Sequence, residues 1–205
     1  MAQVSEQTMP SANEEGLLAI GGDLSIERLK LAYRNGIFPW FEDDNVILWW
    51  SPDPRFVLFP DDLRITKSMQ KTLRKNEFKV TFNTAFHQVI TQCSQTIRTG
   101  QSSTWITEGM IEAYVKLHEQ GWASSVEVWQ DRDLVGGLYG IDLQNGIFCG
   151  ESMFSKVSNT SKIALIALVQ QNKYHLIDCQ IYTAHLARLG ATEIARQEFI
   201  KLLKN

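Results

Sequence analysis

The chain has 205 residues, of which 44% are hydrophobic and 21% are charged. This composition is that of an ordinary globular protein and excludes disordered and fibrous classes. The formal net charge is −3, and no apolar run reaches the roughly 18 residues that a membrane helix needs.

The first predicted element follows a polar segment, Met1–Asn13, that has neither a basic start nor an apolar centre. We expect this segment to be disordered, and it shows no pattern of a signal peptide. A helix is predicted to begin after Ser25, a favourable N-cap residue, and to end at Asn35-Gly36.

A short strand is predicted at Val46–Trp50, inside an aromatic stretch whose prolines exclude a long helix. Pro60-Asp61-Asp62 then marks a change in composition. We therefore predict a small N-terminal domain over residues 1–61 and a larger domain over residues 62–205.

Residues 64–75 predict an amphipathic helix, because Ile65, Met69 and Leu73 fall on one stripe. The opposite face carries positive charge and no acidic residue, through Arg64, Lys67, Lys71, Arg74 and Lys75. Such a face is either a solvated surface or a phosphate-binding surface. Because the chain is acidic elsewhere, this concentration of positive charge favours contacts with phosphates.

The rest of the chain predicts an α+β domain, since three strands in sequence are followed by a helix and a returning strand. The predicted elements are a strand at 78–82, helices at 86–93 and 107–121, strands at 125–129, 134–141 and 147–154, a helix at 160–171, a strand at 176–181, a helix ending at Gly190, a short strand and a terminal helix.

Two of these strands carry polar groups in unusual positions. Glu151 shares a strand face with Cys149 and Met153, and a carboxylate there must be paired, protonated or ligand-binding. Asp178 and Gln180 share one face of the strand at 176–181. A buried network that fixes the core is one explanation. Two such strands joined by one helix favour a functional site.

Other candidate residues are less specific. Trp49, Trp50 and Trp105 lie on short segments, where a tryptophan is either a core residue or a platform for a base. The four histidines are scattered without a nucleophile and are interpreted as structural or surface residues: His87, His118, His175 and His185. The odd number of cysteines indicates reduced thiols in a cytoplasmic protein, and no spacing suggests zinc: Cys93, Cys149 and Cys179.

Seven motifs occur in a fixed order: Gly16–Ser25, Gly36–Phe41, Trp49–Arg55, Thr104–Thr107, Leu134–Gly140, Phe148–Ser155 and Ile177–Gln180. Together they resemble the bacterial leucyl/phenylalanyl-tRNA–protein transferases, and the resemblance extends from Gly16 almost to the end of the chain. One visible departure is Arg188, which stands where the Ser-Leu-Gly-Ala segment of that family has serine.

The resemblance implies a small N-terminal domain joined to a domain of the GCN5-related acetyltransferase (GNAT) type. It implies transfer of leucine or phenylalanine, and methionine less well, from tRNA to proteins that begin with Arg or Lys. This transfer marks the acceptor for degradation in the N-end rule pathway. The partners are then aminoacyl-tRNA and acceptor proteins, with no cofactor, no metal, no membrane association and a monomeric, cytoplasmic enzyme.

The resemblance also implies roles for individual residues. Asp178 would orient Gln180, whose carbonyl oxygen would accept a hydrogen from the attacking amine, although the leaving 3′-oxygen is an alternative proton acceptor. Glu151 would anchor a cationic group, and Trp49 and Trp105 would hold the 3′-terminal adenosine. An apolar pocket for the amino-acid side chain would be lined by Leu138, Phe148, Leu165, Leu168 and Ile177.

Two other functions fit parts of the sequence. An acyl-CoA-dependent N-acetyltransferase would share the domain type, but its pyrophosphate-binding loop is glycine-rich and residues 156–161 contain no glycine. A non-catalytic tRNA-binding module would explain the basic helix and leave Glu151, Asp178 and Gln180 without a role.

Overall fold

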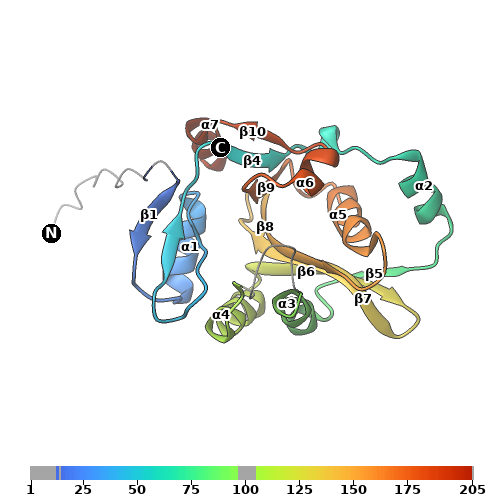
Figure 1. The fold of residues 1–205 in the computed structure, drawn as a ribbon, viewed down its shortest axis with the longest axis horizontal. Helices are drawn as coiled ribbons and strands as arrows, with labels where there is room; N and C mark the ends of the chain where they lie inside the picture. Colours follow the sequence, from blue (N-terminus) through green and yellow to red (C-terminus); the bar gives the residue numbers. More distant parts are fainter. Residues whose placement is uncertain (1–12, 14, 97–104, 205) are drawn as a thin grey trace, which may run out of the picture.

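The chain folds around two β-sheets that pack on a shared core (Figure 1). The computed structural model describes residue 13 and residues 15–96 and 105–204, so the predicted disorder of residues 1–13 falls almost entirely outside the described residues. A small sheet has the strand order β1-β3-β2, and a large one has the order β10-β4-β9-β8-β7-β6-β5. The α+β prediction is confirmed.

The small sheet and one helix form the N-terminal part. The strands are β1 (Leu17–Ile20), β2 (Phe38–Pro39) and β3 (Leu48–Trp50), paired antiparallel. Helix α1 (Ile26–Arg34) begins after Ser25, as predicted, and buries its apolar face against the core.

The large sheet receives its first strand from the N-terminal region. Strand β4 (Arg55–Leu58) lies between β9 (Leu176–Gln180) and β10 (Thr192–Ile194), antiparallel to both. The chain therefore changes sheet between Trp50 and Arg55, before the boundary predicted at residues 60–62. Apolar residues from both parts join one buried cluster, so the N-terminal part has no separate core.

The basic helix is shorter than predicted. Helix α2 (Lys67–Arg74) follows the one-turn helix η1 (Pro60–Asp62) and begins after Thr66, whose side chain caps it by accepting from the Met69 amide. This capping excludes residue 64 from the helix. The predicted cations are all exposed: Arg64, Lys67, Lys71, Arg74 and Lys75.

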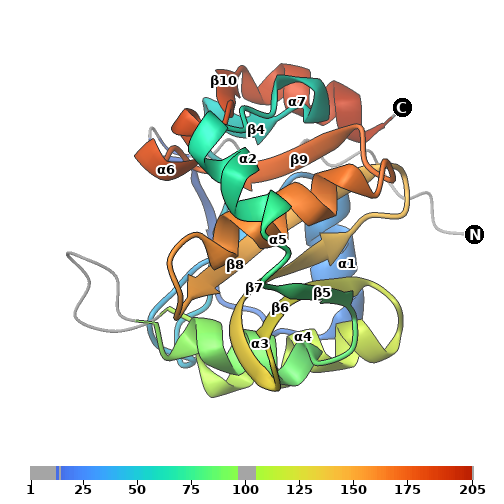
Figure 2. The same cartoon turned by 90° about the vertical axis from the view of Figure 1, so that its right-hand side faces the viewer.

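An antiparallel meander forms the other half of the large sheet, from β5 (Lys79–Phe82) through β6 (Ala123–Gln130) and β7 (Asp133–Asp142) to β8 (Ile147–Ser155). Helices α3 (Phe86–Ser94) and α4 (Glu108–Glu119) cover one face of it, and α5 (Thr160–Gln170) covers the other (Figures 1 and 2). In the described part of the chain, no helix is long and apolar enough to cross a membrane.

Strands β8 and β9 run parallel and are joined by α5, which is the crossover expected of the GNAT-type domain. Their pairing covers Ile147–Cys149 against Leu176–Asp178 and then stops. The two strands consequently separate just before Glu151 and Gln180. The short helix α6 (Ala184–Arg188) and helix α7 (Arg196–Leu203) complete the chain.

Glycines in the sheet allow close approach of neighbouring groups. A Cβ at Gly136 would lie 2.2 Å from Thr160 Oγ1, at the start of α5. A Cβ at Gly140 would lie 2.1 Å from the Cys149 carbonyl oxygen. Cys93, Cys149 and Cys179 form no disulfide in the structure.

We expect Gly140→Ala to destabilise the protein by about 1–3 kcal/mol, because the added methyl group overlaps backbone and the Phe148 ring. The matched control is Gly150→Ala, at the position paired with Gly140 in β8. There the nearest contact of a new Cβ is 3.6 Å, an ordinary distance, so stability should stay within about 1 kcal/mol. Urea unfolding of both variants measures the difference, and equal losses would contradict the prediction.

Candidate active site

A cavity of about 480 Å³ opens where β8 and β9 separate, and α5 and α6 supply further parts of its wall. Its apolar lining includes all five side chains predicted to form the amino-acid pocket: Leu138, Phe148, Leu165, Leu168 and Ile177. The two polar groups singled out from strand parity, Glu151 and Gln180, also line this cavity. The residues that the resemblance implied for the amino-acid pocket therefore lie together in the wall of one cavity.

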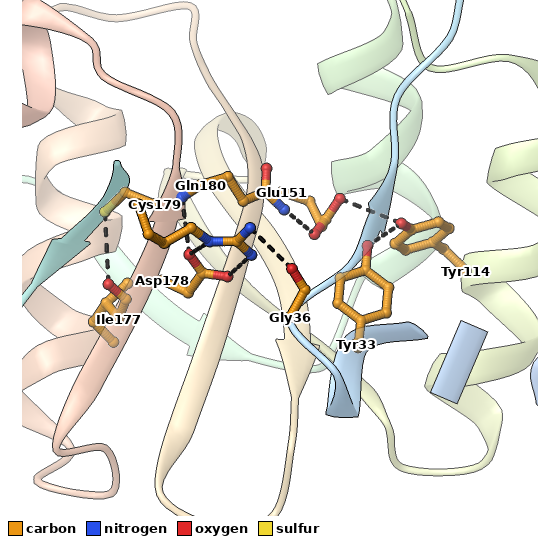
Figure 3. Close-up of polar contacts among 9 residues, drawn as sticks. Tyr33, Gly36, Tyr114, Glu151, Ile177, Asp178, Cys179 and Gln180 are labelled. Atoms are coloured by element: carbon orange, nitrogen blue, oxygen red, sulfur yellow. Dashed lines mark hydrogen bonds and ion pairs between the residues drawn. The ribbon is translucent and has the colours of Figure 1, made fainter. Parts of the chain in front are cut away.

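Gln180 ends β9 with a left-handed backbone, φ +65°. Its amide Nε2 donates to Glu151 Oε1 at 2.7 Å. Within the described part of the chain, its carbonyl oxygen Oε1 accepts no hydrogen bond, as Figure 3 also shows. Because the amide nitrogen is fixed by the carboxylate, the amide plane is set and Oε1 remains available to a ligand.

Glu151 is the centre of a hydrogen-bonded chain drawn from three elements (Figure 3). Its Oε2 accepts from the Tyr114 hydroxyl of α4 at 3.2 Å, and that hydroxyl is bonded to the Tyr33 hydroxyl of α1. Burial raises the pKa of Glu151 to about 7, assisted by the negative charge of Asp178 and opposed by the hydrogen bonds from Tyr33, Tyr114 and Gln180.

Asp178 is fully buried and paired with a buried guanidinium. Arg55 on β4 contacts both carboxylate oxygens, Nε to Oδ1 at 2.8 Å and Nη2 to Oδ2 at 2.6 Å. Its Nη1 donates to the Gly36 carbonyl at 3.0 Å. Burial lowers the pKa of Arg55, but the charge and hydrogen bonds of Asp178 outweigh it and raise this pKa overall.

These contacts divide the positioning of Gln180 between two carboxylates. Asp178 Oδ1 accepts from the Gln180 backbone amide at 3.0 Å, so Asp178 holds the main chain rather than the side-chain amide. Glu151 is the group that orients the amide. Both Glu151 oxygens are occupied by neutral donors, Gln180 and Tyr114, and not by a cation of the described residues.

The two tryptophans predicted to hold adenosine lie in different environments. Trp105 lines the cavity. Trp49 does not: it is buried in the core, and its Nε1 donates to the Gly21 carbonyl at 2.8 Å. Trp40 lines the cavity instead, while Trp50 donates its Nε1 to the Trp40 carbonyl at 2.7 Å. The antiparallel small sheet turns Trp49 inward, an orientation that a short aromatic stretch did not indicate.

Four further residues of the site were missed from the sequence. Tyr33 and Tyr114 lie on the apolar faces of their helices and carried no signal beyond helical spacing. Arg55 stands beside two prolines, and only its tertiary contact with Asp178 distinguishes it. His185 was interpreted as structural or surface, yet it lines the cavity.

The fold and the cavity together define an α+β protein with a site for an apolar group beside an oriented amide. A family model of the leucyl/phenylalanyl-tRNA protein transferase matches residues 57–204, and a model of the N-terminal domain of that transferase matches residues 22–53. This chain belongs to that family and is an enzyme.

The similarity to curated relatives extends over nearly the whole chain. A leucyl/phenylalanyl-tRNA–protein transferase of Flavobacterium johnsoniae is 62% identical over 197 residues, covering 95% of this chain and 92% of the relative. One from Syntrophobacter fumaroxidans is 54% identical, covering 94% and 83%. Among solved structures, a GCN5-related N-acetyltransferase from Kribbella flavida aligns with a TM-score of 0.38 at 10% identity, over 78% of this chain and 57% of that one.

The raised pKa of Glu151 predicts a pH-dependent stability. Between about pH 4.5 and 7 the folded protein keeps a proton that the unfolded chain loses, so the free energy of unfolding should fall as pH rises through this range. Glu151→Gln cannot titrate. Its stability relative to the wild type should therefore increase from pH 5 to pH 8, by roughly 3 kcal/mol at about 1.4 kcal/mol per pKa unit.

Denaturant unfolding of both proteins at several pH values measures this difference. Glu119→Gln, which removes an exposed carboxylate from α4, is the matched control and should follow the wild type across the range. Parallel profiles for Glu151→Gln and the wild type would contradict the prediction.

Proposed function

We propose that this enzyme transfers leucine or phenylalanine, and methionine less well, from aminoacyl-tRNA to the α-amino group of proteins that begin with Arg or Lys. The transfer marks these proteins for the N-end rule pathway. One observation carries the proposal: an apolar cavity meets, at its wall, an oriented amide whose carbonyl oxygen Gln180 Oε1 has no partner among the described residues.

The chemistry fits such a site. An aminoacyl ester is already activated, and an α-amino group with a pKa near 8 is partly neutral at pH 7. The amine nitrogen attacks the ester carbonyl, the bond to the tRNA 3′-oxygen breaks, and the amine proton ends on that oxygen. The protein therefore needs to orient the two reactants and to stabilise the developing charges, without a covalent nucleophile.

The contacts of Gln180 support a role in orienting the amine. Its Oε1 would accept a hydrogen bond from the attacking nitrogen, which directs the nitrogen lone pair toward the ester carbon. Because an amide oxygen is a poor base, the leaving 3′-oxygen takes the proton. Glu151 fixes the amide, and Asp178 with Arg55 fixes the backbone of Gln180.

Binding of the donor would involve three surfaces. The five apolar side chains of the cavity exclude charged amino acids, because burying a charge among them is costly. Trp105 and Trp40, which line the cavity, are the aromatic groups available to the 3′-terminal adenosine. The exposed cations of α2 would contact the phosphates of the tRNA body, which positions the tRNA without reading its sequence.

An acyl-CoA-dependent acetyltransferase is less well supported. In such enzymes backbone amides at the start of the crossover helix bind pyrophosphate. Here the Ser161 amide at the start of α5 donates to Ser155 Oγ at 2.9 Å and is therefore occupied. A non-catalytic tRNA-binding module would not explain the oriented amide of Gln180.

One transfer assay distinguishes these functions. With a peptide that begins with Arg, we expect product from leucyl-tRNA and none from acetyl-CoA, since the cavity suits an apolar side chain next to the amide. The same peptide with an acetylated N-terminus is the control and should accept nothing. Mass spectrometry of the peptide identifies what was added, and acetylation of the free peptide would reverse the assignment.

The role of Gln180 predicts a selective defect. Gln180→Ala should lower the single-turnover transfer rate by about 10²–10³, the usual cost of removing one oriented catalytic group. Affinity for leucyl-tRNA should change little, because the Asp178–Arg55 pair and the backbone remain. The melting temperature should fall only moderately, since Glu151 Oε1 loses one donor. Gln170→Ala, at an exposed position of α5, is the matched control. Losses of activity that merely follow losses of thermal stability would assign Gln180 to the core.

A further inference from the structure

His185 presents a polar atom that the proposed mechanism does not use. Its ring lines the cavity from α6, five residues after Gln180. Its Nε2 is buried from solvent and has no hydrogen-bond partner in the described part of the chain. Buried polar atoms are nearly always hydrogen-bonded, so an unsatisfied ring nitrogen at a cavity wall indicates a ligand atom as its partner.

Two cations lie close to this ring. Partial burial lowers the pKa of His185, and the charges of Lys162 on α5 and Arg188 on α6 lower it further. The imidazole is therefore neutral at pH 7, and the surrounding charge comes from its neighbours. Neither Lys162 nor Arg188 forms an ion pair with any described residue, although Lys162 Nζ donates to Asn159 Oδ1 at 3.1 Å. Two uncompensated cations beside an unsatisfied nitrogen suit an anion.

This group of residues is connected to the basic helix. The Arg64 amide donates to the Leu189 carbonyl at 2.9 Å, which holds the end of α6 against the segment leading into α2. Met69 of α2 packs in the same apolar cluster as Leu189 and α5. Figure 2 shows α2 on the same side of the molecule as α5 and α6. The exposed acidic residues of this segment, Asp61 and Asp62, lie in η1.

We propose that Lys162, His185 and Arg188 bind the sugar-phosphate backbone of the unpaired 3′ end of the tRNA, between α2 and the cavity. This rests on the proposed function. His185, which lines the cavity, donates from Nε2 to the phosphate on the 5′ side of the terminal adenosine. Lys162 and Arg188 contact the preceding phosphates.

The cation contacts are tested by binding, without catalysis. The probe is a fluorescently labelled RNA hairpin that carries no amino acid and ends in an unpaired CCA. It is titrated with the protein at several salt concentrations. Each lost phosphate contact should lower the slope of log affinity against log salt by about 0.7. We expect this change for Lys162→Gln and for Arg188→Ser, and no change for Lys116→Gln, an exposed cation of α4. Slopes equal to the wild type for both variants would overturn the proposal.

His185 is tested by comparing two small donors, 3′-leucyl-adenosine and its 5′-phosphate. The wild type should use the phosphorylated donor at lower concentration, and His185→Phe should bring the ratio of the two kcat/KM values close to one. An equal loss with both donors would assign His185 to the amino-acid pocket or to the fold and overturn its role. If the wild type transfers from no leucyl donor, the proposed function fails, whereas the hairpin titration still decides the phosphate site.

Discussion

The buried ion pair between Arg55 and Asp178 is the interaction on which the site depends. It joins β4 to β9, and the third nitrogen of the guanidinium binds the Gly36 carbonyl after α1. Removing one partner of such a pair typically costs about 3–5 kcal/mol, because the other charge stays buried without compensation. The pair therefore ties the N-terminal part of the chain to the strand that carries Gln180.

The separation of β8 and β9 gives the enzyme both its cavity and its polar centre. Beyond the end of the backbone pairing, Glu151 and Gln180 stay joined through their side chains, by the hydrogen bond from Gln180 Nε2 to Glu151 Oε1. Because pairing stops at Cys149 and Asp178, the next residues of both strands face an open space. Where this pairing ends, the backbone groups of β8 and β9 no longer bond to each other. The Asp178 carboxylate accepts a hydrogen bond from one such group, the Gln180 amide.

The cavity and its surroundings carry different kinds of polar group. At the centre stand a neutral amide and a carboxyl group whose pKa burial raises to about 7. Lys162 and Arg188 act on His185, which lines the cavity, and further cations are exposed on α2. The proposed substrate is apolar at its acylated end and anionic along its backbone, and these local positive charges would favour it although the net charge of the chain is −3.

The sequence by itself determined the fold class and most elements. Strand alternation isolated Glu151, Asp178 and Gln180, since a polar residue on an apolar strand face is a local property. What only the tertiary structure decided was which groups meet. Arg55 reaches Asp178 across 123 positions of sequence, and Trp49 turns into the core while Trp40 lines the cavity. Periodicity reports the face of an element but not the element that covers it, so partners at long sequence separation follow from packing alone.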